Sequence, residues 1–241
     1  MRTADLNIVH PIYNPRPGWA EELLHQYTHL KQMLPAQITI HMYLVNDGSE
    51  TGICVKDIAQ IKETVGQFTY IDSPVNQGKG AALREAVRVT NGKYIIYTDA
   101  DYPYLISNAV EMFQILYSDA ADIVVGVRDE QYYYQLPLVR KIISMSLKKI
   151  NFYFFPQLKL KDTQSGLKGF NENGKDLFLK TQIPTFLFDL EYLVLASKNT
   201  NIRIHPIFIH SREGVVFSKI GVKTILIELL NYIKILFKYS K

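Results

Sequence analysis

Apolar and amphipathic segments alternate through the first half of this chain. Short apolar runs with the composition of buried strands occupy residues 6–10, 38–45, 68–71, 94–98 and 122–127. Segments with apolar positions three and four apart, which predict helices, occupy residues 19–34, 55–65, 79–90 and 106–118. Strands separated by helices of about 10–15 residues form crossover units. We therefore expect an α/β fold with a mostly parallel central sheet flanked by helices.

The second half of the chain is less regular. Residues 137–155 predict one long helix, a loop and short helices follow, and residues 202–209 predict another strand. No repeat or low-complexity linker divides the sequence. The pattern therefore favours one large domain over residues 1–215 and a helical appendage over residues 216–241.

The appendage is apolar, but one side of the predicted helix is polar. Its polar residues recur at steps of three and four: Thr224, Glu228, Asn231, Lys234 and Lys238. A membrane-spanning helix needs about 20 mostly uncharged residues, so an amphipathic helix lying in a membrane surface is favoured over a span. Packing of this helix on the protein's own core or on a partner is the open alternative.

Composition restricts the class of protein. The 241 residues are 47% hydrophobic and 21% charged, which is typical of a soluble globular protein with a full core. A single cysteine, Cys54, excludes an internal disulfide and a thiolate zinc cluster and fits a reducing, cytoplasmic compartment. The apolar residues before His10 are too few for the core of a signal peptide.

The formal charge of +4 is unevenly distributed. Residues 131–161 contain no Asp or Glu, and residues 219–241 contain only Glu228. The first stretch combines basic and aromatic side chains: Arg140, Lys141, Lys148, Lys149, Lys159 and Lys161 with Tyr132, Tyr133, Tyr134, Phe152, Tyr153, Phe154 and Phe155. This mixture suits peripheral contact with an anionic membrane. No motif of a nucleic-acid-binding family appears, so nucleic acid is not an expected partner.

Two carboxylates follow the predicted strand at residues 94–97. Asp99 and Asp101 are one residue apart, so on an extended backbone their side chains point the same way. Hard oxygen ligands at a strand end suit a Mg²⁺ or Mn²⁺ ion that also holds substrate phosphates. The Asp-x-Asp pattern alone is common. It indicates a metal site only in combination with the segments around it.

Polar segments also follow the first two predicted strands. Pro11, Tyr13 and Asn14 form a turn that can stack on a flat base, although turn formation alone also explains them. Asp47 can accept hydrogen bonds from a base N–H or a ribose hydroxyl, or can serve as a helix cap or tight turn.

Glycines open the helix predicted at residues 79–90. Gly78 and Lys79 favour the close approach of an anion to the helix N-terminus. This segment is not a P-loop, because Ser73 holds the first glycine position and Gly80 replaces the Ser or Thr. The glycine fingerprint of dinucleotide-binding proteins is also missing after the first strand. Two further polar segments occupy residues 162–168, which include Gln164, and residues 188–191.

In this order and spacing, the segments resemble family 2 glycosyltransferases of the GT-A fold over about residues 5–215. Residues 162–166 and 188–191 resemble those of polyprenyl- and dolichyl-phosphate sugar transferases, particularly the glucosyl branch. The resemblance implies roles for individual residues. The nucleotide and donor would be bound by Pro11, Tyr13, Asn14, Asp47, Gly78, Lys79, Asp99 and Gln164; Asp99 and Asp101 would hold the metal; and Arg128 would lie near the phosphates as a catalytic residue.

Three positions depart from the family pattern. Pro15 follows Asn14 where an acidic residue is usual, and Asn46 replaces the first of two usual aspartates. Pro103 stands where many lipid-phosphate members carry a polar side chain that completes the metal shell. The sequence therefore specifies no third protein ligand of the metal.

The implied reaction is inverting displacement at the anomeric carbon of a nucleotide-diphosphate sugar. A lipid monophosphate is anionic near pH 7, because its second pKa is about 6, and needs no general base. A sugar hydroxyl needs one, and Asp189 is the candidate, with Glu191 next. Alternatively, Asp189 caps a helix and Glu191 is solvated or paired.

Three functions follow. The first is a hexosyltransferase that acts on a polyprenyl or dolichyl-type lipid phosphate at the cytoplasmic membrane face. The second is a soluble glycosyltransferase that builds a glycan on a saccharide acceptor, and the third is a nucleotide-sugar-binding module with impaired catalysis. UDP-glucose is the first expected donor and GDP-mannose the second, and the sequence specifies no oligomeric state.

Overall fold

The computed structural model describes residues 5–129, 132, 136, 138–158, 160, 162–212 and 221–239. Four residues of the basic and aromatic stretch, Tyr133, Tyr134, Lys159 and Lys161, lie outside the described residues, as does the side chain of Arg140. The boundary expected at residues 215–216 also lies outside them and stays a prediction.

Among the described residues, seven strands form one sheet. They are β1 (Leu6–Ile12), β2 (Ile40–Asp47), β3 (Phe68–Ser73), β4 (Tyr94–Tyr97), β5 (Ile123–Arg128), β6 (Lys168–Phe170) and β7 (Ile204–Ile209), in the spatial order β3-β2-β1-β4-β6-β5-β7. All neighbouring pairs are parallel except those of β6, which runs antiparallel between β4 and β5. The mostly parallel sheet is confirmed, but β6 was not predicted, because three residues are too few to show a periodic pattern.

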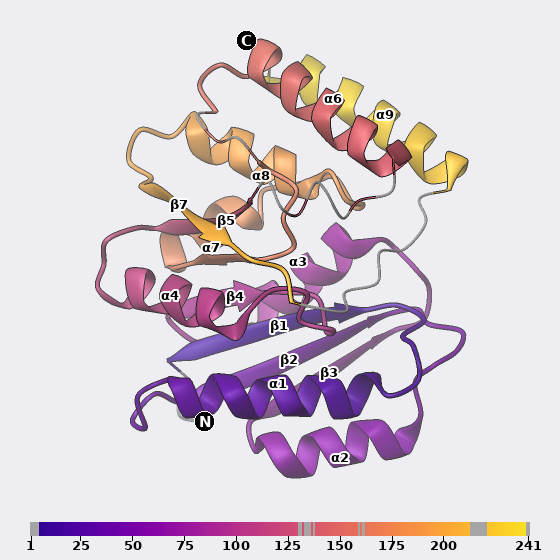
Figure 1. Cartoon of the computed structure of the whole chain (residues 1–241), viewed down its shortest axis with the longest axis vertical. Coiled ribbons are helices and arrows are strands. Elements are labelled where there is room, and N and C mark those ends of the chain that lie inside the picture. Colours follow the sequence, from indigo (N-terminus) through magenta and orange to yellow (C-terminus); the bar gives the residue numbers. More distant parts are fainter. Residues whose placement is uncertain are drawn as a thin grey trace.

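Helices cover both faces of the sheet (Figure 1). They are α1 (Trp19–Met33), α2 (Val55–Val65), α3 (Lys79–Val89), α4 (Ile106–Tyr117), α6 (Leu138–Phe154), α7 (Glu172–Phe178), α8 (Phe188–Ser197) and α9 (Val222–Tyr239). The predicted helices and strands of the first half agree with these bounds to within about two residues. Among the described residues, none of the helices has the length and apolarity needed to cross a membrane.

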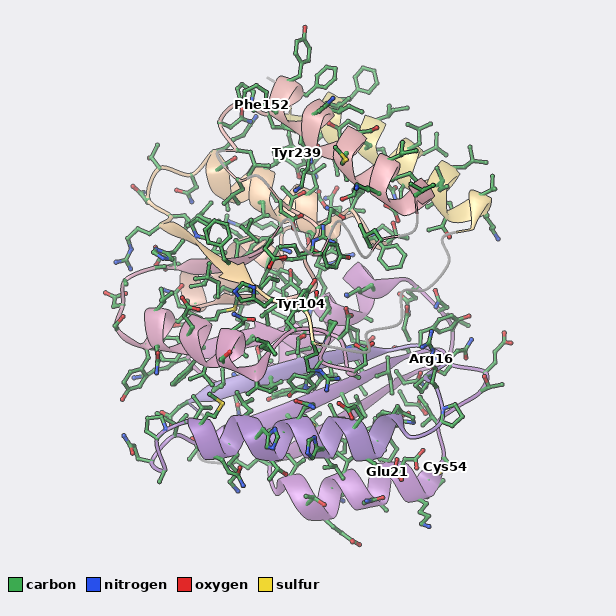
Figure 2. The ribbon with its side chains drawn as sticks, viewed as in Figure 1. Arg16, Glu21, Cys54, Tyr104, Phe152 and Tyr239 are labelled. Carbon is green, nitrogen blue, oxygen red and sulfur yellow. The ribbon has the colours of Figure 1, made fainter. Side chains whose placement is uncertain are left out.

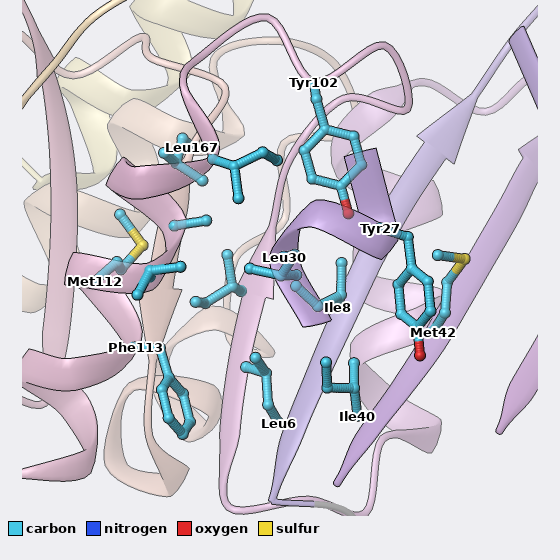
Figure 3. Packing of buried hydrophobic residues seen from close by; sticks show 14 of the residues in the cluster. Leu6, Ile8, Tyr27, Leu30, Ile40, Met42, Tyr102, Met112, Phe113 and Leu167 are labelled. Carbon is cyan, nitrogen blue, oxygen red and sulfur yellow. The ribbon is translucent and has the colours of Figure 1, made fainter. Parts of the chain in front are cut away.

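Two hydrophobic clusters lie on opposite faces of the sheet. Alternate strand residues point to opposite faces. Ile8 therefore belongs to the cluster that includes residues of α1, α2 and α4, whereas Val9 belongs to the cluster that includes residues of α3, α8 and α9. Figure 3 shows the first cluster, in which Ile8 and Met42 lie beside Tyr27 of α1. Both faces are covered, which explains why the strands are near-continuous apolar runs.

This arrangement brings the predicted polar segments to one edge of the sheet. β1 pairs with β2 and β4 in parallel register, with Ile12 opposite Asn46 and Val9 opposite Tyr97. The residues that follow β1, β2 and β4 therefore meet at the carboxyl ends of the strands, where open α/β sheets bind their ligands.

Candidate active site

Three segments meet at the carboxylate of Asp99. Lys79, the first residue of α3, forms an ion pair with it. Gly166, just before β6, packs against its other side, and a Cβ atom added to Gly166 would lie 2.7 Å from Asp99 Oδ2. Real Cβ atoms essentially never approach so closely, so any larger residue at this position would force the Asp99 carboxylate to move. We call residues 76–80 the glycine-rich loop. The structure therefore brings together the acidic pair, the glycine-rich loop and residues 162–168, as the sequence predicts.

The second carboxylate of the pair, Asp101, lies close to Asp99. Local desolvation raises the pKa of Asp101, and the negative charge of Asp99 raises it further. The charges of Lys79 and Arg212 partly offset this repulsion. Two carboxylates that repel each other present the oxygen donors that a divalent cation prefers.

The remaining metal ligands would come from outside the protein. Among the described residues, no three or more His, Cys, Asp or Glu side chains gather in a way that could hold a metal ion. Mg²⁺ typically keeps several waters and takes one or two carboxylates plus substrate phosphates. The two carboxylates fit such an ion, with phosphate and water completing its shell because Pro103 offers no side-chain ligand.

The turn that carries the acidic pair is held from two sides. Tyr102 has a φ of 42°, a conformation that is uncommon for a bulky residue. Its hydroxyl donates to His10 Nε2 over 3.1 Å, and His10 Nδ1 donates to the Thr98 carbonyl over 3.0 Å. Burial lowers the pKa of His10 to about 4, so the imidazole is neutral and its two nitrogens suit these partners.

Arg212 holds the same turn from the other side. Its guanidinium donates to the carbonyl oxygens of Tyr102 and Asp101, each over 2.7 Å, and pairs with Glu22 of α1 at 2.6 Å. Its backbone N–H donates to the Pro103 carbonyl over 3.0 Å. The turn is therefore fixed by His10 of β1 and by Arg212 after β7, and Glu22 of α1 in turn pairs with Arg212.

Asp47 supports the glycine-rich loop directly. Its buried carboxylate accepts the backbone N–H of Gln77 over 2.7 Å and that of Gly78 over 2.9 Å. Burial raises the pKa of Asp47, and these hydrogen bonds oppose the rise. The predicted contact of Asp47 with a nucleotide stays a prediction, whereas its contact with the loop is observed.

The glycines of this loop have a packing role that the sequence did not reveal. A Cβ atom on Gly78 would lie 2.6 Å from the Pro184 carbonyl oxygen, and one on Gly80 would lie 2.6 Å from Phe188 Cβ. Both glycines therefore let residues 183–188 pack against the start of α3. Lys79 lies between them.

The turn after β1 lies beside the turn after β2. Asn14, with a φ of 44°, accepts the N–H groups of Glu50 and Thr51 at 2.9 and 3.2 Å through its side chain, and its own N–H donates to Ser49 Oγ over 2.8 Å. Tyr13 is exposed and Pro11 is partly buried. Asn14 thus joins the two turns, and the exposed ring of Tyr13 is free of the sheet core.

A cavity of about 610 Å³ opens at the carboxyl ends of β2 and β3. Its volume lies within the range of small-molecule sites. Asn46 Nδ2 donates to Asp72 Oδ1 over 2.7 Å at its wall. Tyr70 Oη donates to the same oxygen over 3.2 Å, and Ile53 and Ile58 supply an apolar surface.

Arg128 is buried and bound to Asp162. Its Nε and Nη2 donate to the two carboxylate oxygens over 2.6 and 2.8 Å, and its Nη1 donates to the Tyr132 hydroxyl over 3.0 Å. Burial alone would raise the pKa of Asp162, but the charge and hydrogen bonds of Arg128 outweigh it and lower the pKa to about 2. The pair fixes residues 162–166 to the end of β5, and the backbone N–H of Gln164 also donates to Asp162 over 3.1 Å.

Asp189 is buried at the start of α8 and forms an ion pair. Its Oδ1 lies 2.8 Å from Lys168 Nζ and accepts the hydroxyl hydrogen of Tyr97. Lys168, with no exposed side-chain surface, also donates to the Ser165 carbonyl over 2.7 Å. Burial raises the pKa of Asp189 and lowers that of Lys168, because it disfavours both charges.

The hydrogen-bond partners of Glu191 give its carboxylate a structural role. One oxygen of its buried carboxylate accepts the N–H groups of Gln182 and Ile183, each over 2.7 Å, and the other accepts the Tyr239 hydroxyl over 2.9 Å. Glu191 therefore holds the loop before α8 and the end of α9.

Sequence reasoning assigned no role to Lys168, Arg212, His10 or Asp72. Lys168 follows the Gly166 segment, but a basic residue gives no sign in the sequence that it will be buried. His10 directly precedes the predicted Pro11 turn. Among these four residues, its position was the one feature of the sequence that could have indicated a role near the site. The partners of Arg212 and Asp72 are distant in sequence, and the sequence pattern does not indicate such contacts.

Comparisons with known proteins give the family and the fold of the chain. The family model described as "Glycosyl transferase family 2" matches residues 8–173. The chain is 26% identical over 204 residues to a Trichomonas vaginalis protein named dolichyl-phosphate beta-glucosyltransferase ALG5D, covering 80% of this chain and 62% of that protein. The chain thus spans about three fifths of the length of this curated relative.

Solved structures share the fold at low sequence identity. Mannosyl-3-phosphoglycerate synthase from Rubrobacter xylanophilus has a TM-score of 0.69 at 14% identity, covering 98% of this chain and 73% of that chain. The mannosyltransferase PcManGT from Pyrobaculum calidifontis, in complex with GDP-Man and Mn²⁺, has a TM-score of 0.60 at 16% identity, covering 89% and 59%. The fold is the GT-A fold. With the family model matching more than half of its residues, this chain belongs to glycosyl transferase family 2.

Proposed function

We propose that this protein transfers a sugar from a nucleotide-diphosphate sugar to a polyprenyl or dolichyl-type lipid phosphate, with inversion at the anomeric carbon. The observation that carries the proposal is the cluster of Asp99, Asp101 and Lys79 at the carboxyl end of β4. The name of the Trichomonas relative supports a dolichyl-phosphate acceptor. UDP-glucose is the first donor to test and GDP-mannose the second.

The strand spacing supports the binding of a nucleotide across the sheet edge. β2 and β4 both neighbour β1, so the Asn46 end of the cavity and Asp99 are separated by about two strand spacings, or roughly 10 Å. A nucleoside diphosphate bridges such a distance. Its base would enter the cavity near Asn46, with Tyr13 available for stacking, and its diphosphate would reach Asp99 and Lys79.

The charges at Asp99 suit departure of the diphosphate. Asp99 and Asp101 would hold Mg²⁺ or Mn²⁺, which when bound neutralises charge on the leaving diphosphate. Lys79 places a further positive charge at the N-terminus of α3, where anions bind favourably. Asp47 fixes this loop through Gln77 and Gly78, so the positive charges are positioned before the donor arrives.

The state of Asp189 favours a phosphate acceptor over a sugar hydroxyl. Its ion pair with Lys168 and its hydrogen bond from Tyr97 leave it poorly placed to take a proton. A phosphate acceptor already carries negative charge near pH 7 and attacks without a base. The catalytic role of Asp189 as a base therefore belongs to the alternative, transfer to a saccharide. A lipid acceptor also implies peripheral contact at the cytoplasmic face of a membrane.

The direct test is transfer of labelled glucose from UDP-glucose to a polyprenyl phosphate in detergent, with Mn²⁺ or with EDTA. We expect label in the organic-soluble product only with the metal. Asp99→Asn and Asp101→Asn should each reduce the rate at least a hundredfold, the scale seen when one stabilising group is lost from a transition state. Glu111→Gln, an exposed carboxylate on α4, is the matched control and should be unchanged.

Three results would overturn parts of the proposal. Transfer to a saccharide but not to a lipid phosphate would overturn the acceptor. Nucleotide-sugar binding without transfer to either would indicate a binding module. Undiminished transfer by Asp101→Asn, or transfer unaffected by EDTA, would overturn the metal site.

A further inference from the structure

Two residues in the middle of the polar stripe of α9, Glu228 and Asn231, contact the protein, whereas Lys234 is exposed. Glu228 accepts the backbone N–H groups of Phe186 and Leu187 over 3.1 and 3.2 Å, just before α8 begins. Asn231 is buried and donates to Thr185 Oγ1 over 2.8 Å. Contacts with the loop before α8 therefore occupy these two polar residues.

The opposite side of α9 presents apolar residues to solvent. Its exposed apolar residues recur mostly at steps of three and four: Val222, Leu226, Ile227, Leu229, Leu230, Ile233 and Phe237. This spacing makes one continuous stripe along the helix. An apolar stripe directed outward, with Glu228 and Asn231 directed inward, differs from the usual arrangement of a surface helix in a water-soluble domain.

α6 carries a similar exposed stripe and lies beside α9. Its exposed apolar residues are Leu138, Ile142, Met145, Ile150, Phe152, Tyr153 and Phe154. α6 and α9 run across the same end of the molecule (Figure 1). Phe155, immediately after α6, contacts Tyr232 of α9, with ring centroids 6.3 Å apart, and Phe152 lies at the outer edge of the molecule (Figure 2). We call these two stripes together the α6–α9 surface.

The charges around the α6–α9 surface are of one sign. The sequences of the two helices contain one acidic residue, Glu228, whose carboxylate is turned toward α8. Lys149, Lys223 and Lys234 are exposed on the same helices. Apolar and aromatic side chains bordered by lysines match the boundary between acyl chains and anionic headgroups.

We propose that the α6–α9 surface docks in the plane of an anionic lipid bilayer, with both helices parallel to the membrane. The inference rests on the proposed function for the identity of the membrane-borne acceptor, and on the charge pattern for the choice of a lipid partner. Docking through two helices buries apolar area that a monomeric soluble protein rarely leaves exposed. It does not require either helix to cross the bilayer.

Vesicle flotation of the full chain tests this proposal. We expect the protein to float with vesicles of phosphatidylcholine containing phosphatidylserine, and weakly with phosphatidylcholine alone. Phe152→Gln and Phe237→Gln, at residues 82% and 83% exposed, should each weaken binding about tenfold or more. Phe208→Gln on β7, at a residue 69% exposed but outside this surface, is the matched control and should bind as the unmodified protein does.

The lysines give an independent measurement. Lys149→Gln and Lys234→Gln should each weaken binding to the anionic vesicles about fivefold, and added salt should weaken it further. Lys31→Gln on α1, an exposed lysine outside the surface, should leave binding unchanged. Unchanged melting followed by circular dichroism establishes that each variant is folded.

Several outcomes would overturn docking. One is absence of flotation with anionic vesicles, and another is equal loss of binding in Phe208→Gln. A third is self-association without lipid that Phe237→Gln abolishes, since it would assign the surface to a second copy of the chain. Transfer to a short, water-soluble polyprenyl phosphate reports the proposed function separately. Phe237→Gln should retain that transfer if only docking is affected, so failure of one idea is distinguishable from failure of the other.

Discussion

Replacement of Asp189 by Asn distinguishes a structural carboxylate from a catalytic base. The side chains of Lys168 and Asp189 are 0% and 6% exposed, and Nζ and Oδ1 are 2.8 Å apart. Asparagine keeps the shape but removes the negative charge, so Lys168 would be left with an uncompensated ammonium group. Removal of one partner of a buried ion pair typically costs about 3–5 kcal/mol. Because whole domains are stable by only about 5–15 kcal/mol, the loss should be large.

The assay is urea unfolding followed by the fluorescence of Trp19, the only tryptophan of the chain, which is buried in α1. Asp189→Asn should lower the free energy of unfolding by about 3–5 kcal/mol. The double variant Asp189→Leu with Lys168→Met should recover most of the loss, because apolar replacement of a buried pair is often neutral or stabilising. The two single effects should therefore not add.

Transfer by the same variant completes the test. With a lipid phosphate acceptor, folded Asp189→Asn should keep its rate within about tenfold, since the acceptor needs no base. Loss of a general base would instead slow transfer by about a hundredfold to ten-thousandfold. A loss of that size, together with an unfolding free energy changed by less than about 1 kcal/mol, would refute the structural assignment and restore Asp189 as the base.

Three further predictions concern the acidic turn and its supports. Gly166→Ala should displace Asp99 and weaken Mn²⁺-dependent UDP binding at least tenfold by isothermal titration, while Gly221→Ala, with nothing within 4 Å of the added Cβ, should not. Arg212→Ala loses two charge-assisted hydrogen bonds at 2.7 Å, each worth about 1.5–3 kcal/mol, so UDP binding should weaken at least tenfold and Arg212→Lys should recover part of it. The lowered pKa of Asp162, about 2, stabilises the fold above its unfolded pKa, 3.8. As the pH falls from about 5 to 2, about 2 kcal/mol should be lost, and Asp162→Asn should lack this slope in acid unfolding.

The sequence predicted the parts of the fold that repeat. Strand and helix periodicity identified β1 through β5 and the helices between them, because burial of whole faces imposes regular spacing over many residues. β6, which lies between β4 and β5 in the sheet, has only three residues. Three residues are too few to show a periodic pattern in the sequence. The antiparallel direction of β6 depends on the path of the preceding chain, which local sequence does not specify.

The sequence indicates which candidate site residues lie close together where polar residues follow strand ends, but their roles stay predictions. Asp99, Lys79 and the Gly166 segment follow or precede regular elements, so the sheet brings them together. The buried partners were less accessible. Lys168 and Arg212 act through contacts with residues far away in the chain, and a charged residue in a sequence is expected at the surface unless its partner is known.

The polar stripe of α9 shows why periodicity alone leaves the orientation of a helix open. Steps of three and four place Glu228 and Asn231 on one side of the helix. This spacing does not show whether water or protein supplies the hydrogen-bond partners of those side chains. Here the N–H groups before α8 need acceptors, and Glu228 supplies them. On the other side of the same loop, the Pro184 carbonyl accepts the N–H of Ala81 in α3 over 3.0 Å. Residues 184–187 therefore contact both α9 and the helix that carries Lys79. The helix proposed to meet lipid thus also supports the segment that packs against the glycine-rich loop.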